Sequence, residues 1–234
     1  SSVALNLLKE THDVTAFYLK IWLEDELAHL GSCPWEDDWS VCESVCAQAG
    51  VPLESLSLQA EYKDAVISYT IEEARKGRTP NPDIMCNSRV KFGCFLKAIE
   101  GRGFDYVASG HYAQLVDGGD AAAATRRLVR GVDDVKDQSY FLCGLTQEQL
   151  KNVIFPVGGL SKAEVRRLAE EFQLPNRARP DSQGLCFLGK VKFEEFIGAY
   201  LGEGRGEVVD AGTGEVIGEH KGLWFHTVGQ RRGM

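Results

Sequence analysis

The sequence predicts an α/β protein with a doubly wound, mostly parallel sheet, followed by the start of a small β-rich domain. Short apolar runs rich in β-forming residues alternate with segments of helical spacing, which favours a parallel sheet covered by helices. From Gly202 onward the sequence is Gly-rich with short alternating runs, which is typical of small antiparallel strands. The 234 residues are 44% hydrophobic and 26% charged, the composition of an ordinary folded chain. We expect one domain over 1–188 and a linker helix with a small β-rich domain over 189–234.

Periodicity and stop signals place the elements of the first half. Gly50 and Pro52 end one helical segment, and Gly77 ends another. Short runs of apolar and β-forming residues between these segments predict strands. The expected elements in order are a helix at 1–10, a buried strand at 14–19, a helix at 39–49, a strand at 53–58, helices at 62–76 and 87–99, and a strand at 106–108.

Two further segments of the second half have clear local signals. Residues 116–125 (VDGGDAAAAT) are of low complexity and predict a surface loop between two short strands. Ser161 and Glu164 fit a capping box that opens a helix reaching about Phe172.

No stretch approaches the ~18 uninterrupted apolar residues that a membrane helix requires, so we expect no membrane association.

Charge is distributed unevenly. The chain has 26 basic and 34 acidic residues, a net charge of −8. Residues 21–60 hold eight acidic residues and no Lys or Arg, whereas residues 75–102 hold seven basic residues against two acidic ones. Because association responds to the local potential within a Debye length of ~8–10 Å, net acidity does not exclude a polyanionic partner. A solvated helix face explains the same basic segment equally well.

The seven cysteines argue against a disulfide-stapled fold. Their number is odd, no secretory signal precedes them, and they are spread along the chain, so we expect reduced thiols in an intracellular compartment. No CxxC pair occurs, which disfavours a zinc knuckle or a thioredoxin-type site. Cys42 and Cys46 are expected to be packed without a metal, and no metal ligands are predicted.

The segment 77–87 (GRTPNPDIMCN) is the densest group of chemically useful residues. Two prolines stiffen it, and Asn87 is expected to cap the next helix. Cys86 would then lie at a helix start in a basic segment, where the helix dipole and the cations favour the thiolate. Asp83 lies three residues earlier, close enough to handle a proton. The alternative is a proline-stiffened loop with a buried cysteine.

Three other polar segments stand out. Cys186 follows a polar turn in 179–189 (RPDSQGLCFLG), and whether it meets Cys86 depends on the fold. Residues 136–140 (KDQSY) offer hydrogen-bond donors for a phosphate or a sugar. Residues 109–112 (SGHY) follow a predicted strand, where doubly wound folds bind nucleotides. A single histidine in such a place, His111, is more often structural than catalytic.

Taken together and in this order, the segments RTPNPDIMCN, SGHY, KDQSYFL, FPVG, DSQGLCFLGK and HTVGQRRG closely resemble the tRNA-specific 2-thiouridylases (tRNA-uridine 2-sulfurtransferases). The resemblance covers nearly the whole chain. It implies membership of the ATP-pyrophosphatase superfamily, an adenine-nucleotide alpha-hydrolase-like fold for the first domain, and exchange of the C2 oxygen of a wobble uridine for sulfur.

The resemblance also implies roles for individual residues. Cys86 matches the family's nucleophile and Cys186 the cysteine that carries a persulfide, while Asp83 matches the proposed acid or base. Ser1 and Ser2 match the end of the phosphate loop. The positions that match nucleotide-lining residues are Leu19 and Gly110, and those that match tRNA contacts are Asn81, Pro82, Asp83, His111, Lys136, Asp137 and Gln138.

The implied reaction uses ATP with Mg²⁺ to adenylate the uridine, takes sulfur from the Cys186 persulfide and leaves a disulfide between Cys86 and Cys186. The implied partners are tRNA and a persulfide donor protein, either a cysteine desulfurase or a relay protein. The chain opens where the family's phosphate loop ends and stops where a C-terminal β-barrel follows, so we expect a fragment of a longer enzyme. The compartment expected is the cytoplasm, or a plastid or mitochondrion if the protein is organellar.

Three alternatives stay open at this stage. An ATP-pyrophosphatase-type ligase or amidotransferase acting on a small molecule would use the same fold, with incidental cysteines. A non-catalytic RNA-binding remnant would account for the missing phosphate loop. An iron–sulfur cluster held by Asp83, Cys86 and Cys186 would handle the sulfur in another way.

Overall fold

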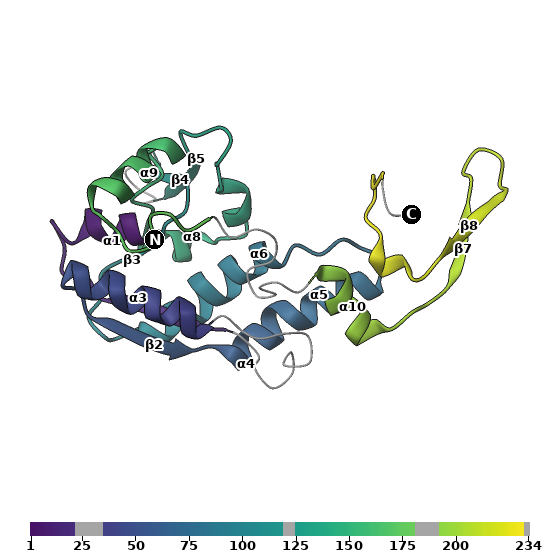
Figure 1. Cartoon of the computed structure of the whole chain (residues 1–234), viewed down its shortest axis with the longest axis horizontal. Helices are drawn as coiled ribbons and strands as arrows, with labels where there is room; N and C mark the ends of the chain where they lie inside the picture. The colour runs from purple at the N-terminus through teal and green to yellow at the C-terminus, as the bar shows by residue number, and fades with distance from the viewer. Residues whose placement is uncertain (22–34, 119–124, 181–191, 232–234) are drawn as a thin grey trace.

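The structure is a computed structural model that describes residues 1–21, 35–118, 125–180 and 192–231. Helices and short strands alternate in a main body, and the C-terminal segment extends away from it (Figure 1). Among the described residues no helix is both long enough and apolar enough to cross a membrane. The alternation of helices and strands confirms the α/β class predicted from the sequence.

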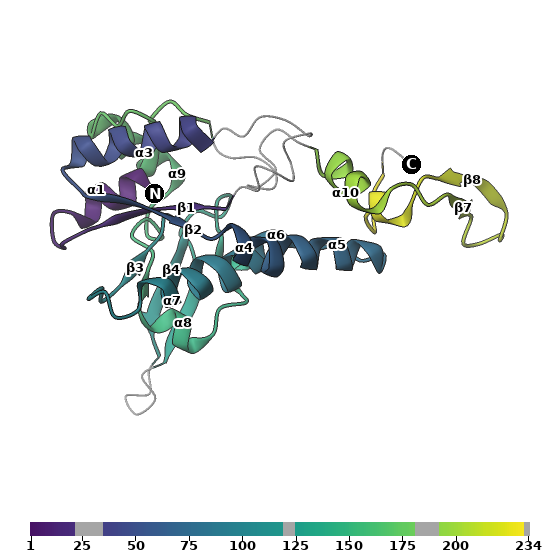
Figure 2. The same ribbon diagram turned by 90° about the horizontal axis from the view of Figure 1, so that it is seen from below.

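Strand β1 (Ala16–Lys20) pairs in parallel with β2 (Leu53–Ser57). Its alternating side chains face two helical layers, as the period of two in a strand requires. Phe17 and Leu19 pack on the main hydrophobic core, whereas the Tyr18 ring contacts the Trp39 ring of α3 (Trp35–Ala49) at 5.5 Å between centroids. Figure 2 shows α3 and α1 (Ser2–Leu8) on one side of the pair and α4 to α7 on the other. Both faces of this pair are thus covered by helices.

Two long helical segments build the main core. The first runs through α4 (Gln59–Tyr62), a π-helix (Lys63–Ile67) and α5 (Ser68–Arg75), and the second through α6 (Pro82–Met85), a π-helix (Cys86–Cys94) and α7 (Phe95–Ile99). Tyr62, Val66 and Val90 are at most 1% exposed in this core. Thr70 is also fully buried, and its hydroxyl donates to the Val66 carbonyl at 2.7 Å, so the buried polar group is satisfied.

The rest of the main body consists of two further strand pairs and their helices. Strand β3 (Val107–Ala108) pairs in parallel with β6 (Val153–Ile154), and β4 (Ala113–Asp117) pairs antiparallel with β5 (Arg126–Arg130). A 3₁₀ turn (Ser139–Leu142), α8 (Gln147–Lys151) and α9 (Lys162–Glu171) complete it. The capping box predicted for α9 is confirmed, because Ser161 Oγ accepts from the Glu164 amide and the Glu164 carboxylate accepts from the Ser161 amide.

The C-terminal segment contains α10 (Phe193–Leu201), an antiparallel hairpin of β7 (Gly206–Val209) and β8 (Val216–His220), and a 3₁₀ turn (Leu223–Phe225). The small antiparallel strands predicted after Gly202 are therefore confirmed. Helix α10 is anchored to the main core, since Phe196 and Ile197 are both 0% exposed and belong to it. The hairpin projects beyond this anchor (Figure 1).

Several sequence-based boundaries need correction. The second long helical segment begins at Pro82, not at Asn87, because Asn81 supplies the cap and Pro82 suits the first helical position. Strand β1 is half-buried along its length rather than buried. The described strands form four two-stranded sheets, of which β1–β2 and β3–β6 are parallel.

Candidate functional site

The helix that carries Cys86 starts with a well-formed cap. The Asn81 side-chain oxygen accepts from the Ile84 amide at 3.2 Å, and Pro82 follows as the first helical residue. Asp83 lies in the first turn, where a carboxylate is favoured by the helix dipole. Cys86 was predicted to lie at the helix start, but it lies one turn after it. The helix dipole therefore favours its thiolate less than it would at the very start of a helix.

Cys86 is buried where α6 meets the π-helix. It is 2% exposed and belongs to the main hydrophobic core, on the same helix as Asp83 and three residues after it. Residues at this spacing share a helix face. Its expected partner Cys186 lies outside the described residues, so the predicted pairing of the two cysteines stays a prediction. π-Helices are rare in proteins, and those that occur are frequently found at functional sites.

The segment 136–144 crosses the Cys86 helix and is bonded to it at two places. Asn81 donates from Nδ2 to the Tyr140 hydroxyl at 3.4 Å, and Asn87 donates from Nδ2 to the Phe141 carbonyl at 3.0 Å. Asn87, predicted to be a cap, is instead 3% exposed and holds this crossing in place. Phe141 was missed as a site residue, and the contact of Tyr140 with the helix was not predicted, because only the fold brings these residues to the helix.

Asp137 and Gln138 use their side chains within the protein. The Asp137 carboxylate accepts from the Gly131 amide at 2.8 Å and from the Ser139 hydroxyl at 2.9 Å. Burial, the largest single influence, raises the pKa of Asp137, but the hydrogen bonds together outweigh it and leave the pKa below its usual value. The Gln138 side chain accepts from the backbone amide of Tyr112 through Oε1 at 3.0 Å, and the backbone amide of Gln138 donates to the Tyr112 carbonyl at 2.8 Å. The two residues therefore shape the turn and fasten it to the SGHY loop.

Lys136, the third residue of this predicted tRNA contact, is half-buried. Its backbone amide donates to the Asp133 carboxylate at 3.0 Å. The structure thus brings the predicted segments 136–138 and 109–112 together, and it brings both to the Cys86 helix through Tyr140 and Phe141.

His111 is packed as a neutral ring. Its Nδ1 lies 2.7 Å from the Ser109 hydroxyl, and its ring centroid lies 6.1 Å from that of Phe92 and 5.9 Å from that of Phe155. Burial, with a smaller contribution from Lys91, lowers the pKa of His111 to about 3. At neutral pH the imidazole therefore carries no charge with which to attract a phosphate.

We expect His111 to stabilise the protein less as the solution becomes acidic. Its pKa is about 3 in the folded protein against an ordinary 6.5, so its contribution is fully present above about pH 6.5 and is lost as the pH falls toward 3. Urea unfolding of the wild type and His111→Gln checks this, because their difference in unfolding free energy should shrink between about pH 7.5 and about pH 4.5. The exposed His12 provides the control variant His12→Gln. A His111→Gln difference that is the same at both pH values would contradict the expectation.

The predicted nucleotide residues meet in one place only in part. A Cβ built on Gly110 would overlap the Ser1 backbone nitrogen and would lie 3.0 Å from Ser1 Cα, so Gly110 allows a close approach of the two segments. Ser2 accepts a hydrogen bond from the Asn176 side chain through Oγ at 2.9 Å. Leu19 is half-buried in β1 with its side chain on the main core. Ser1 and Gly110 are therefore neighbours, whereas the Leu19 side chain serves packing.

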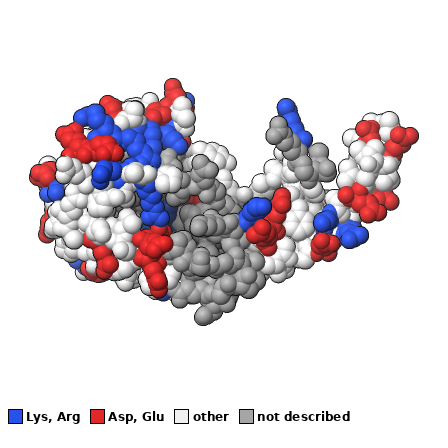
Figure 3. All heavy atoms as spheres, viewed as in Figure 1, with Lys and Arg blue, Asp and Glu red and all other residues white. Residues whose placement is uncertain are grey.

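Three of the seven basic residues at 75–102 pair with carboxylates in the folded chain. Lys76 pairs with Glu72, Arg78 pairs with Glu73, and Arg102 pairs with Glu54 at 2.8 Å. Figure 3 shows Lys and Arg side chains gathered instead over the region of α9 and β5 on the main body. Arg127 and Arg130 of β5 and Arg167 of α9 belong to these elements.

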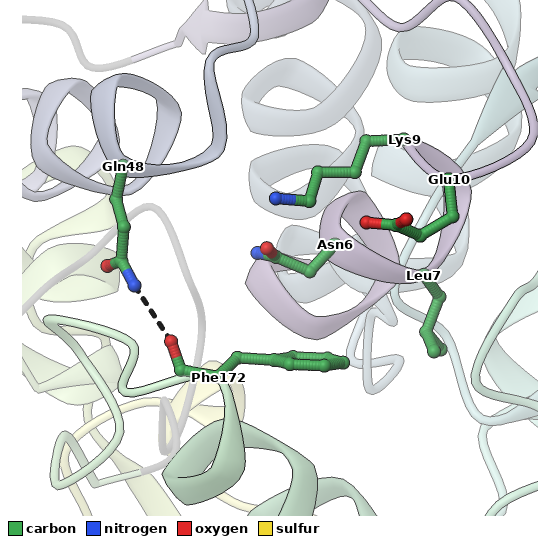
Figure 4. Close-up of a pocket in the computed structure, with 6 residues that line it drawn as sticks. All are labelled: Asn6, Leu7, Lys9, Glu10, Gln48 and Phe172. Atoms are coloured by element: carbon green, nitrogen blue, oxygen red, sulfur yellow. Dashed lines mark hydrogen bonds between the residues drawn. The ribbon is translucent and has the colours of Figure 1, made fainter.

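A pocket of about 270 Å³ has none of the predicted site residues in its lining. Its lining comes from the ends of α1, α3 and α9, and the Gln48 side chain donates to the Phe172 carbonyl at 2.7 Å across it (Figure 4). The lining residues are Asn6, Leu7, Lys9, Glu10, Gln48 and Phe172. Among the described residues, no group of three or more His, Cys, Asp or Glu side chains is arranged to hold a metal ion.

Curated proteins of known name are similar to this chain over its full length. The tRNA-specific 2-thiouridylase MnmA of Parabacteroides distasonis is 45% identical over 236 residues, which cover 100% of this chain and 64% of that protein. The proteins of the same name from Porphyromonas gingivalis and Listeria monocytogenes are each 43% identical and are covered over 63% and 62% of their lengths. The chain thus spans slightly less than two thirds of these relatives.

Family models match nearly every residue. The model described as tRNA methyl transferase HUP domain matches residues 1–190, and the model described as tRNA methyl transferase PRC-barrel domain matches residues 194–234. The first of these alone covers more than half of the chain. The chain therefore belongs to the tRNA methyl transferase family, with a HUP domain followed by a PRC-barrel domain.

Proposed function

We propose that the protein containing this chain is a tRNA-uridine 2-sulfurtransferase, which replaces the C2 oxygen of a wobble uridine with sulfur. The observation that carries the proposal is the convergence of three segments at Cys86: its own helix, the 136–141 segment bonded to that helix through Asn81 and Asn87, and the 109–112 loop bonded to Gln138. Relatives named tRNA-specific 2-thiouridylase share the whole chain, which favours sulfur transfer over the methyl transfer in the family's description.

The proposed reaction requires the C2 oxygen to become a leaving group. ATP adenylates that oxygen and pyrophosphate departs. Cys86 then attacks the Cys186 persulfide, forming the Cys86–Cys186 disulfide and releasing hydrosulfide, which adds to C2 and displaces AMP. In the alternative order the terminal persulfide sulfur attacks C2 first and displaces AMP, which leaves the base joined to Cys186 through an S–S bond. Cys86 then attacks the Cys186 sulfur, forming the same disulfide and freeing the thiolated base. A reductant then reopens the disulfide.

Named residues take separate roles in this scheme. Asp83, on the helix of Cys86, acts as the acid or base of the reaction. Residues 81–83 meet the target base. Lys136 and His111 contact the tRNA, with His111 acting as a neutral group. Ser1, Ser2, Leu19 and Gly110 belong to the ATP site, and the close approach of Gly110 to Ser1 supports this grouping. Asp137 and Gln138 support the tRNA contact from within the turn.

Mg²⁺ and an iron–sulfur cluster have no group of candidate ligands among the described residues. Cys86 is packed among hydrophobic side chains, with Asp83 as its nearest candidate co-ligand along the helix. No step of the scheme passes through either group.

We further propose that the two parallel strand pairs belong to one doubly wound sheet. Phe17 and Leu19 of β1, Leu56 of β2 and Val107 of β3 all pack on the same core. The proposed boundary between the catalytic domain and the β-rich domain lies at residues 188 and 189. The persulfide on Cys186 would come from a cysteine desulfurase or a relay protein.

The direct test is the 2-thiouridine content of tRNA from a thiouridylase-deficient strain that carries the full-length gene containing this chain. Nucleoside mass spectrometry should find 2-thiouridine restored by the unchanged gene and absent with Cys186→Ser, because the serine cannot carry a persulfide. Thiolation that survives Cys186→Ser would reject Cys186 as the sulfur carrier. A soluble protein that restores no thiolation would reject the function itself.

A further inference from the structure

The side-chain amide of Gln149 in α8 has partners for both of its ends. Its Nε2 donates to the Ser88 carbonyl at 2.6 Å and to the Phe92 carbonyl at 2.7 Å, while its Oε1 accepts from the Thr146 amide at 2.9 Å. The opposite orientation of the amide would place an oxygen against two carbonyl oxygens, so the chemistry of the partners fixes the orientation. The side-chain amide thus donates two hydrogen bonds through Nε2 and accepts one through Oε1.

Both acceptor carbonyls belong to the π-helix that begins at Cys86. A π-helix is rare and occurs mostly as a short bulge, which needs support from its surroundings. Gln149 supplies such support from a different helix by joining two carbonyls about one turn apart. The fit is close, because a Cβ on Gly93 would lie 3.0 Å from the Ser88 oxygen and 3.9 Å from Gln149 Nε2.

The state of the π-helix decides where the Cys86 thiol points. If the wide turn tightened to an α-helix, the register would change by one residue, a rotation of about 100° about the helix axis. Cys86 is 2% exposed, so its surroundings leave little room for a change of rotamer to compensate for such a rotation. We propose that Gln149 is a positioning residue, which holds the π-helix open and thereby keeps Cys86 oriented for sulfur transfer. This inference rests on the proposed function.

The chain itself offers a matched control. Gln147 lies in the same helix and also makes two side-chain hydrogen bonds, but its partners are the amide and carbonyl of Arg126 in β5, at 2.9 and 3.0 Å. Gln147→Leu therefore removes two side-chain hydrogen bonds of α8, against the three of Gln149, without touching the π-helix. Cys46 in α3, 5% exposed, reports whether the rest of the protein has loosened.

The experiment measures alkylation by iodoacetamide at each cysteine of the full chain, by peptide mass spectrometry. We expect Gln149→Leu to accelerate alkylation of Cys86 at least tenfold, which corresponds to about 1.4 kcal/mol of easier local opening. Alkylation of Cys46 should stay unchanged, and Gln147→Leu should alter neither rate. An unchanged rate at Cys86, or equal acceleration at Cys86 and Cys46, would overturn the inference.

A second measurement uses tRNA thiolation by the full-length protein. Gln149→Leu should lower kcat about a hundredfold, the cost of a catalytic group displaced by about 1 Å, and change KM for tRNA less than twofold. Gln147→Leu should keep the wild-type kcat. If the unsubstituted protein does not thiolate tRNA, the proposed function fails, whereas the alkylation rates still decide whether Gln149 holds the Cys86 helix.

Discussion

Cys86→Ser is expected to lower tRNA 2-thiolation by at least about a thousandfold, because a serine hydroxyl can neither open a persulfide nor form the final disulfide. The substitution changes one atom at a site that is 2% exposed, so the fold should persist. The buried hydroxyl should cost about 1–3 kcal/mol of unfolding free energy unless it finds a hydrogen-bond partner. Nucleoside mass spectrometry of tRNA and urea unfolding measure the two effects separately.

Cys94 supplies the control for this substitution. It ends the same π-helix, is half-buried and packs against the same core. Cys94→Ser should leave thiolation close to the wild-type level, because the proposed reaction gives Cys94 no role. Wild-type thiolation by folded Cys86→Ser protein would remove Cys86 from the mechanism, and equal loss in both variants would point to damage to the helix.

Gly158→Ala is expected to destabilise the protein by about 3 kcal/mol or more. A Cβ at Gly158 would overlap the carbonyl oxygen of Ala113 and would lie 2.5 Å from its carbonyl carbon. Ala113 is 0% exposed at the start of β4, so neither backbone can withdraw without disturbing the core. Overpacking of this kind costs about 1–3 kcal/mol and occasionally more, and a clash with backbone belongs at the upper end.

The neighbouring Gly159 supplies the control for Gly158→Ala. A Cβ at Gly159 would have nothing within 4 Å, so Gly159→Ala should change stability by less than about 0.5 kcal/mol. Urea unfolding of the two variants checks the difference. Because Tyr112 precedes Ala113 and is bonded to Gln138, Gly158→Ala should also disturb the 136–138 turn. Equal stability of the two variants would show that the strand yields easily at this point.

The sequence by itself determined the family, the α/β class and the local elements. Helix α9 could be predicted because its capping box joins Ser161 and Glu164, only three residues apart. The antiparallel strands after Gly202 could be predicted because alternation and turn residues are local signals. The six ordered motifs led to the proposal of Cys86 and its neighbours as site residues for the same reason, since a motif is a property of consecutive residues.

Only the tertiary structure decided how these segments meet. The cap of the Cys86 helix was assigned to Asn87, but packing against Phe141 buries Asn87 and leaves Asn81 to cap. The side chain of Gln138 was expected to face tRNA, yet it accepts a hydrogen bond from the backbone amide of Tyr112, 26 residues away in the chain. Such contacts depend on distances between remote segments, which close only when the common core forms. Local spacing therefore specifies the helices and motifs, and burial of the shared core decides which polar groups remain for chemistry.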